Sequence, residues 1–335
     1  MKGAASLKTF KKIMILAFVL LIVGFVLLVK GADVFVDGSS SIAKFLKIPS
    51  IIIGLTIVAF GTSAPEAAVS IIAGINGSND IAVGNVIGSN MFNLLMVIGI
   101  SAIIKPIAIQ KQIVTKDYPF MLLATAALAV MSYDVFFGNG TANVISRNEA
   151  VILLMFLGIF LFYVISSALR SRKENMSAAS EEDEKPKYGI GVSILCTIGG
   201  LAGIVIGGQL VVDSAEKIAL GLGMSETLVG LTIVAVGTSL PELVTSIVAA
   251  KKGESDIAVG NVVGSNVFNM LFVLPASAVI TPMNINSQSL TDLIILIGVS
   301  VLTYFFCATN KRVNRVEGAI LAAIYAVYLA YAIIR

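Results

Sequence analysis

The sequence predicts an all-α integral membrane protein with ten transmembrane helices, arranged as two inverted five-helix repeats. Its composition is 57% hydrophobic and 13% charged, whereas soluble proteins carry about 25% charged residues. Apolar segments of about 20 residues, the length that a bilayer crossing requires, recur along the chain. A stretch of 40 residues also occurs twice, at residues 54–93 and 230–269. Together these features place the whole chain in a lipid bilayer.

Ten apolar segments define the predicted helices. The first, at residues 13–29, follows four lysines as a signal peptide would. It is long, lacks a small-residue cleavage site and has a counterpart before the second copy of the repeat, so we interpret it as a retained helix. The other nine lie at residues 50–75, 82–104, 118–132, 148–168, 189–211, 226–250, 258–280, 289–308 and 316–334.

A polar segment separates the two halves. Residues 170–188 are charged and almost free of bulky apolar side chains, which predicts a flexible linker on the cytoplasmic side. We therefore divide the chain into a first half at residues 1–169, this linker, and a second half at residues 189–335.

The two copies of the repeat share polar residues as often as apolar ones. They align at a constant offset of 176 positions, with 27 identities in 40 pairs. Apolar identities follow from composition, but shared Thr, Ser, Glu and Asn do not. The corresponding helices are the second and the seventh, five crossings apart, so the copies enter the membrane from opposite sides. Inverted repeats are typical of secondary transporters that bind substrate near the bilayer midplane.

Each copy places one carboxylate inside an uncharged apolar segment, Glu66 in GTSAPE and Glu242 in GTSLPE. An ionisable group at this depth indicates a functional site. A proline precedes each glutamate and should kink its helix, because proline lacks an N–H and clashes with an earlier carbonyl. The carbonyls freed near residues 59–62 and 235–238 need partners inside a membrane. A cation would satisfy them.

Hydroxyl and amide side chains accompany the glutamates. Asn93 and Asn269 lie four residues beyond a serine on the same helix face, and we expect them to line the site. Asn85 and Asn261 lie near helix starts, which favours capping or interhelical bonding. For Asn90 and Asn266 we expect packing roles, for Asp80 and Asp256 helix capping, and for Gly84, Gly88, Gly260 and Gly264 close helix approach.

This all-oxygen set suits hard cations. Calcium accepts six to eight oxygen ligands at about 2.3–2.6 Å, and two glutamates would neutralise its charge. Sodium can use the same oxygens, whereas magnesium demands stricter octahedral geometry. The repeats contain no imidazole or thiolate, which argues against zinc and copper.

The composition also excludes several classes of function. The chain has no histidine, so a Ser–His nucleophile is impossible, and no lysine base accompanies Ser63 or Ser239; we expect no enzyme activity and no cofactor. The net charge of +3 is spread over loops and indicates no nucleic-acid partner. Cys196 and Cys307 are expected as small buried hydrophobes. The bilayer is the expected surrounding, with no obligate protein partner.

The distribution of basic residues predicts the orientation. With both termini outside the cell membrane, the inner segments carry 16 of the 23 Lys and Arg residues and the outer ones 7. The positive-inside rule favours this arrangement, although the four N-terminal lysines argue for the reverse.

The repeats resemble those of the cation/calcium exchanger superfamily, specifically prokaryotic sodium/calcium exchangers. GTSAPE with GNVIGSNMFN resembles the first α-repeat, and GTSLPELVTS with GNVVGSNVFN the second. The resemblance implies a secondary active antiporter that exchanges sodium for calcium by alternating access, with helices 1 and 6 sliding across the other helices. The calcium ligands that it implies are the side chains of Glu66 and Glu242 and the backbone carbonyls of Thr62 and Thr238. The implied sodium positions use Glu66, Glu242, Ser63, Ser239, Ser89, Ser265 and the carbonyls of Ala59 and Ala235, with Asn93 and Asn269 lining the centre.

One position departs from part of that superfamily. Some prokaryotic members and the potassium-dependent branch have Asp where this chain has Asn269. By resemblance, this argues against potassium co-transport and weakens proton coupling. Calcium/proton exchange with Glu66 and Glu242 as proton carriers is the alternative, and a cation channel is a further one.

Overall fold

The computed structural model describes residues 2–138, 141–177, 186–224, 235–309 and 311–334, which are almost entirely helical. The helices of the first half, where η marks a π-helical turn, are α1 (Lys2–Leu46), α2 (Ser50–Ile53), η1 (Gly54–Val58), α3 (Ala59–Thr62), α4 (Ala64–Ile75), α5 (Asn79–Phe92), η2 (Asn93–Val97), α6 (Ile98–Ile104), η3 (Ile113–Asp117), α7 (Tyr118–Met131) and α8 (Arg147–Ser177). Those of the second half are α9 (Ile190–Gly221), α11 (Ala235–Gly237), α12 (Leu240–Lys252), α13 (Ser255–Phe268), η5 (Asn269–Val273), α14 (Leu274–Ile280), α15 (Ser287–Thr309) and α16 (Arg315–Ile334).

The described helices match a multi-pass membrane protein. Eight are long and apolar enough to cross a bilayer, and the bent pair at residues 50–75 makes nine. These correspond to nine of the ten predicted segments. The remaining segment, at 226–250, begins at residues that lie outside the described ranges and continues in α12. The count of ten therefore stays a prediction.

Several predicted boundaries were wrong, all in the same direction. α1 extends far beyond the predicted residues 13–29, and α9 continues ten residues past the predicted end at 211, to Gly221. The first part of the predicted linker is helical, since α8 ends at Ser177. Polar residues in these extensions, such as Ser39 and Ser41, are buried against neighbouring helices. A prediction from hydropathy ends each segment where the apolar residues end, whereas backbone hydrogen bonding continues the helix beyond that point.

Four two-residue strands join the two halves of the sequence. β1 (Ile107–Ala108) pairs antiparallel with β4 (Arg312–Val313), and β2 (Val144–Ile145) pairs antiparallel with β3 (Met283–Asn284). In the register, Ile107 faces Val313 and Val144 faces Asn284. The sequence predicts helices alone, because strands of two residues leave no alternating pattern to detect.

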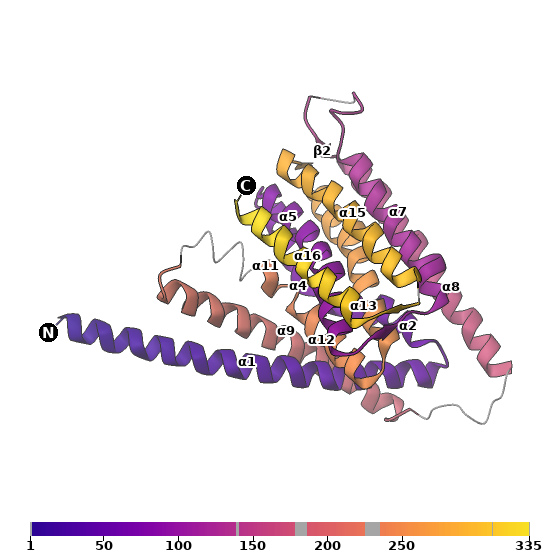
Figure 1. Cartoon of the computed structure of the whole chain (residues 1–335), viewed down its shortest axis with the longest axis horizontal. Coiled ribbons are helices and arrows are strands. Elements are labelled where there is room, and N and C mark those ends of the chain that lie inside the picture. The colour runs from indigo at the N-terminus through magenta and orange to yellow at the C-terminus, as the bar shows by residue number, and fades with distance from the viewer. Residues whose placement is uncertain (1, 139–140, 178–185, 225–234, 310, 335) are drawn as a thin grey trace.

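α1 and α9 lie side by side along one edge of the molecule, as Figure 1 shows. Glycines form this contact. A Cβ added to Gly31 would lie 2.7 Å from the backbone nitrogen of Ile204, and one added to Gly207 would lie 2.5 Å from that of Leu28. The two backbones therefore touch directly, as small residues allow in membrane helices.

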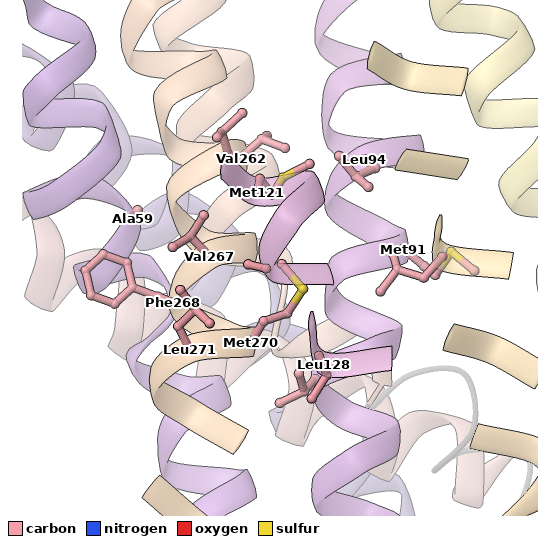
Figure 2. Close-up of a cluster of buried hydrophobic side chains, with 14 of the residues drawn as sticks. Ala59, Met91, Leu94, Met121, Leu128, Val262, Val267, Phe268, Met270 and Leu271 are labelled. Carbon is pink, nitrogen blue, oxygen red and sulfur yellow. The ribbon is translucent and has the colours of Figure 1, made fainter. Parts of the chain in front are cut away.

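The buried core is centred on α13, η5 and α14. Within residues 255–280, 94% of the most apolar 18-residue stretch is buried. The corresponding share in α16 is 11%, because that helix faces outward. Figure 2 shows part of the core, where Val267 and Met270 of α13 and η5 lie among side chains of α5, η2 and α7. Thr125 of α7 donates to the sulfur of Met270 at 3.3 Å. This packing holds the two copies of the repeat against each other.

Candidate cation-binding site

The helix that carries Glu66 breaks just before Pro65, in agreement with the kink expected from the proline. α3 ends at Thr62, Ser63 has φ −82° and ψ 5°, and α4 begins at Ala64, with a bend of 48° between the two segments. The second copy repeats the break at Ser239, with φ −93° and ψ 6° before α12. Each glutamate thus lies in the first turn of a new helix, where the helix dipole favours a carboxylate.

Serines cross between the two copies to reach the glutamates. Ser63 Oγ donates to Glu242 Oε1 at 3.0 Å, and Ser239 Oγ donates to Glu66 Oε1 at 3.0 Å. Ser89 lies beside this second pair, 3.4 Å from Glu66 Oε1 and 3.1 Å from Ser239 Oγ. The break in each copy therefore supports the carboxylate of the other, so the two copies build a single site.

Four buried oxygens of this region accept no hydrogen bond. They belong to side chains with no exposed surface, and they are Glu66 Oε2, Glu242 Oε2, Asn93 Oδ1 and Asn269 Oδ1. η2, which carries Asn93, packs against α12, and η5, which carries Asn269, packs against α4. No ion pair involves either glutamate in the described part of the chain. Two buried carboxylates without positive partners require protons or a bound cation.

A second set of hydrogen bonds braces the breaks. Thr62 Oγ1 donates to Asn261 Oδ1 at 2.9 Å, while Asn261 Nδ2 donates to the carbonyl of Glu242 at 3.3 Å. The equivalent bonds join Thr238 to Asn85 at 3.4 Å and Asn85 to the carbonyl of Glu66 at 3.2 Å. The interhelical role expected of the two asparagines is confirmed, and both threonine hydroxyls are occupied.

Neutral oxygens must complete any cation site here. Among the described residues, no three His, Cys, Asp or Glu side chains come together. Two carboxylates with serine, amide and carbonyl oxygens form a set that suits sodium or calcium and lacks the ligands that zinc and copper prefer.

Comparison with known proteins identifies the family. Residues 16–166 and 192–334 match the family described as sodium/calcium exchanger protein. The chain belongs to the sodium/calcium exchanger family. The family consists of transporters rather than enzymes, in agreement with the sequence analysis.

Several relatives match over nearly their whole length. The putative antiporter CaxA of Alkalimonas amylolytica is 38% identical, with 92% of this chain and 96% of the relative covered. The sodium/calcium exchanger MaX1 of Methanosarcina acetivorans is 33% identical, with coverage of 93% and 97%. A structure of the sodium-calcium exchanger NCX_Mj soaked with 10 mM Na+ and 10 mM Sr2+ is 33% identical and superposes with a TM-score of 0.81, covering 95% of this chain and 98% of that one.

The exchanger brings most of the predicted site residues together. Ser63, Ser89 and Ser239 contact the glutamates directly. Ser265 lies beside Glu242, and its hydroxyl is 3.4 Å from the carbonyl of Ala59, which also accepts the N–H of Ser63 at 3.0 Å. Ala235 is the first described residue after a gap, and its side chain lies outside the described residues. The roles of these residues as ion ligands stay predictions.

Three expectations about the surrounding residues need correction or completion. No side-chain cap bond forms at the start of α5 or α13; Asp80 accepts from Asn286 at 2.8 Å, and Asp256 accepts from Gln110. Gly260 and Gly264 do approach α2, η1 and α3 closely. In the other copy, most of the segment that would approach Gly84 and Gly88 in the same way, residues 225–234, lies outside the described ranges.

Asn90 and Asn266, expected to be packing residues, instead bond to the asparagines of the site. Asn269 Nδ2 donates to Asn90 Oδ1 and Asn93 Nδ2 donates to Asn266 Oδ1, each at 3.1 Å. The sequence did contain a signal, because both copies keep an asparagine at this position beside a predicted site serine.

Proposed function

We propose that this protein exchanges sodium for calcium across the cell membrane by alternating access, with Glu66 and Glu242 as the centre of one shared site. Calcium binds between the two carboxylates, and sodium ions compete for the same oxygens. No cofactor takes part, and the exchanged ions are its substrates.

One observation carries the proposal. The two halves contribute equivalent acceptor oxygens, one carboxylate and one amide each, and all four are buried without a donor. A dehydrated cation needs several oxygens at once. Since the glutamates have no exposed surface, an ion enters or leaves only when helices move. α1 and α9 meet closely through glycine backbones, which suits movement of the two helices as one unit against the rest of the molecule.

The proposed architecture has ten spans in two inverted halves, at residues 1–169 and 189–335, joined by a segment at 170–188 on the cytoplasmic side. Both termini then lie outside the cell. The equivalent hydrogen bonds of the two halves support the repeat, and the distribution of basic residues supports the orientation.

The test is uptake of calcium-45 into proteoliposomes that contain the purified protein. An outward sodium gradient is compared with outward potassium, lithium and proton gradients, each in wild type and Glu66→Gln. We expect uptake with the sodium gradient alone and its loss in the variant. Asn269 in place of an aspartate favours independence from potassium.

The matched control is Glu149→Gln. Glu149 accepts hydrogen bonds from Ser146 at the start of α8, away from the site, so exchange should persist. Equal loss in both variants would indicate a general effect of removing a carboxylate and would contradict the proposed site. Uptake that needs no counter-gradient would indicate a channel.

Calcium/proton exchange is the second candidate. Two buried carboxylates without a basic partner can be neutralised by protons as well as by cations. The assay separates the two, because a proton-coupled exchanger takes up calcium when the lumen is acidic and sodium is absent.

A further inference from the structure

Two pairs of asparagines form a crossed arrangement beside the candidate site. Asn93 of η2 bonds to Asn266 of α13, and Asn269 of η5 bonds to Asn90 of α5. All four side chains are buried, with at most 1% of their surface exposed. The offset of 176 positions relates one pair to the other. The arrangement is therefore part of the repeat.

The hydrogen bonds run in the same direction in both pairs. In each, the residue that ends the GSNxxN segment donates its Nδ2, and the residue three positions earlier in the other copy accepts. A carboxamide has donors at one end and an acceptor at the other. With Nδ2 occupied, the free ends of Asn93 and Asn269 are the oxygens, which accept no hydrogen bond.

The opposite orientation would oppose cation binding. An amide turned by half a rotation presents its N–H groups where the oxygen had been, and N–H groups repel a cation. It also removes the donor from the buried acceptor on Asn90 or Asn266, which costs free energy.

The helices around these residues have an unusual geometry. η2 and η5 begin at Asn93 and Asn269, and the N–H groups of Ile98 and Leu274 reach back five residues to the carbonyls of these asparagines. Such π-helical turns occur frequently at functional sites. Asn266 is held in turn, because its Nδ2 lies 3.5 Å from the carbonyl of Asn90.

We propose that Asn90 and Asn266 are positioning residues that set cation affinity by fixing the amides of Asn269 and Asn93 with their oxygens toward the ion. This inference rests on the proposed function. The orientation matters particularly at Asn269, because an aspartate at this position would present an oxygen in either orientation and would not need to be oriented.

The test is a double-mutant cycle on calcium binding by the purified protein in detergent, measured by calorimetry without transport. Asn90→Leu removes the acceptor while keeping the number and branching of the side-chain heavy atoms, and it should weaken calcium binding roughly tenfold. In the Asn269→Asp background, the same substitution should change affinity by less than about twofold, because the orientation no longer matters.

Asn90→Asp supplies the conservative control. It keeps an acceptor for Asn269 and loses only the Nδ2 group, which has no hydrogen-bond partner. We expect calcium affinity at or above that of wild type. If Asn90→Leu does not yield a folded protein, Asn266→Leu with Asn93→Asp provides the equivalent cycle in the other copy.

Two outcomes overturn the inference. One is that Asn90→Leu binds calcium with wild-type affinity. The other is that Asn90→Leu lowers the affinity equally in the wild-type and Asn269→Asp backgrounds, as a purely structural role would. Failure of the proposed function looks different, since wild type would then not take up calcium in exchange for sodium.

Discussion

The centre of the molecule is nearly the same in both halves, whereas the ends of the two long helices differ. At the centre, the bond from Ser63 to Glu242 has an equivalent of the same length from Ser239 to Glu66. At one end of α1, Asp33 and Asp37 meet Lys252 at 2.8 and 2.6 Å, and Lys187 reaches Asp37 at 2.6 Å. We refer to these four residues as the α1 ion-pair cluster.

Among the described residues, the equivalent end of α9 has no such cluster. The positions that correspond to Asp33 and Asp37 are Gln209 and Asp213, and they bond to each other at 2.6 Å. Asn76 stands at the position equivalent to Lys252, so no charge is available there. The halves thus share the side chains of the candidate site but not the contacts that hold α1 and α9 against the other helices. The symmetry of the repeat is kept at the proposed ion site and lost at the ends of these two helices.

The largest expected effect tests the symmetry of the centre. Glu242→Gln should abolish exchange as Glu66→Gln does, with each loss about hundredfold or more, because removal of one buried charged partner costs about 3–5 kcal/mol. Sodium-driven calcium-45 uptake is the measurement. A mild effect in only one variant would show that the two carboxylates have different roles.

A smaller difference is expected between the two serines. Ser239 contacts both Glu66 and Ser89, whereas the hydroxyl of Ser63 contacts Glu242 alone. Ser239→Ala should therefore weaken calcium affinity more than Ser63→Ala, with a loss of roughly tenfold or more for the former. Calorimetric titration of both variants measures this, and identical losses would argue against the additional role of Ser89.

The α1 ion-pair cluster predicts an effect on conformation rather than on binding. Lys252→Met should release the end of α1 and change the exchange rate by about threefold, the scale of partly exposed ion pairs. Spin labels at positions 45 and 251, in a background without Cys196 and Cys307, should then show a second, longer distance. Lys111→Met is the matched control, and the same distances in both variants would exclude a holding role for the cluster.

The smallest effect is expected at Lys187. Its hydrogen bond to Asp37 raises the pKa of Lys187 above the ordinary value of 10.5. A raised lysine pKa stabilises the fold below its ordinary value and loses that contribution as the pH rises past the raised one. Lys187→Gln should thus change exchange by less than about twofold, equally at pH 6 and pH 9. A pH-dependent difference would assign Lys187 a larger role.

The repeat allowed much of the site to be predicted from the sequence. Two copies of GTSxPE locate the glutamates, serines and helix breaks, because a proline interrupts helical hydrogen bonding and a charge inside an apolar span is costly to keep without a function. The repeat keeps Asn90 and Asn266 beside the predicted site serines, but their bonding partners could not be predicted, since these depend on how α5 and η2 meet α13 and η5 in space. Helix ends beyond the membrane, such as those of α1 and α8, also lack a hydropathy signal.

The two short strand pairs have a mechanical consequence. Each ties a loop of the first half to a loop of the second, through Ile107 with Val313 and through Val144 with Asn284. Neither α1 nor α9 contributes a strand, and these two helices touch each other through bare backbone. The molecule can therefore be described as a fixed part, whose two halves are joined by the strand pairs, and a pair of helices, α1 and α9, outside these connections. In the proposed mechanism, the strand pairs would keep the two halves of the fixed part together, and the movement of α1 and α9 would decide which side of the membrane the ion meets.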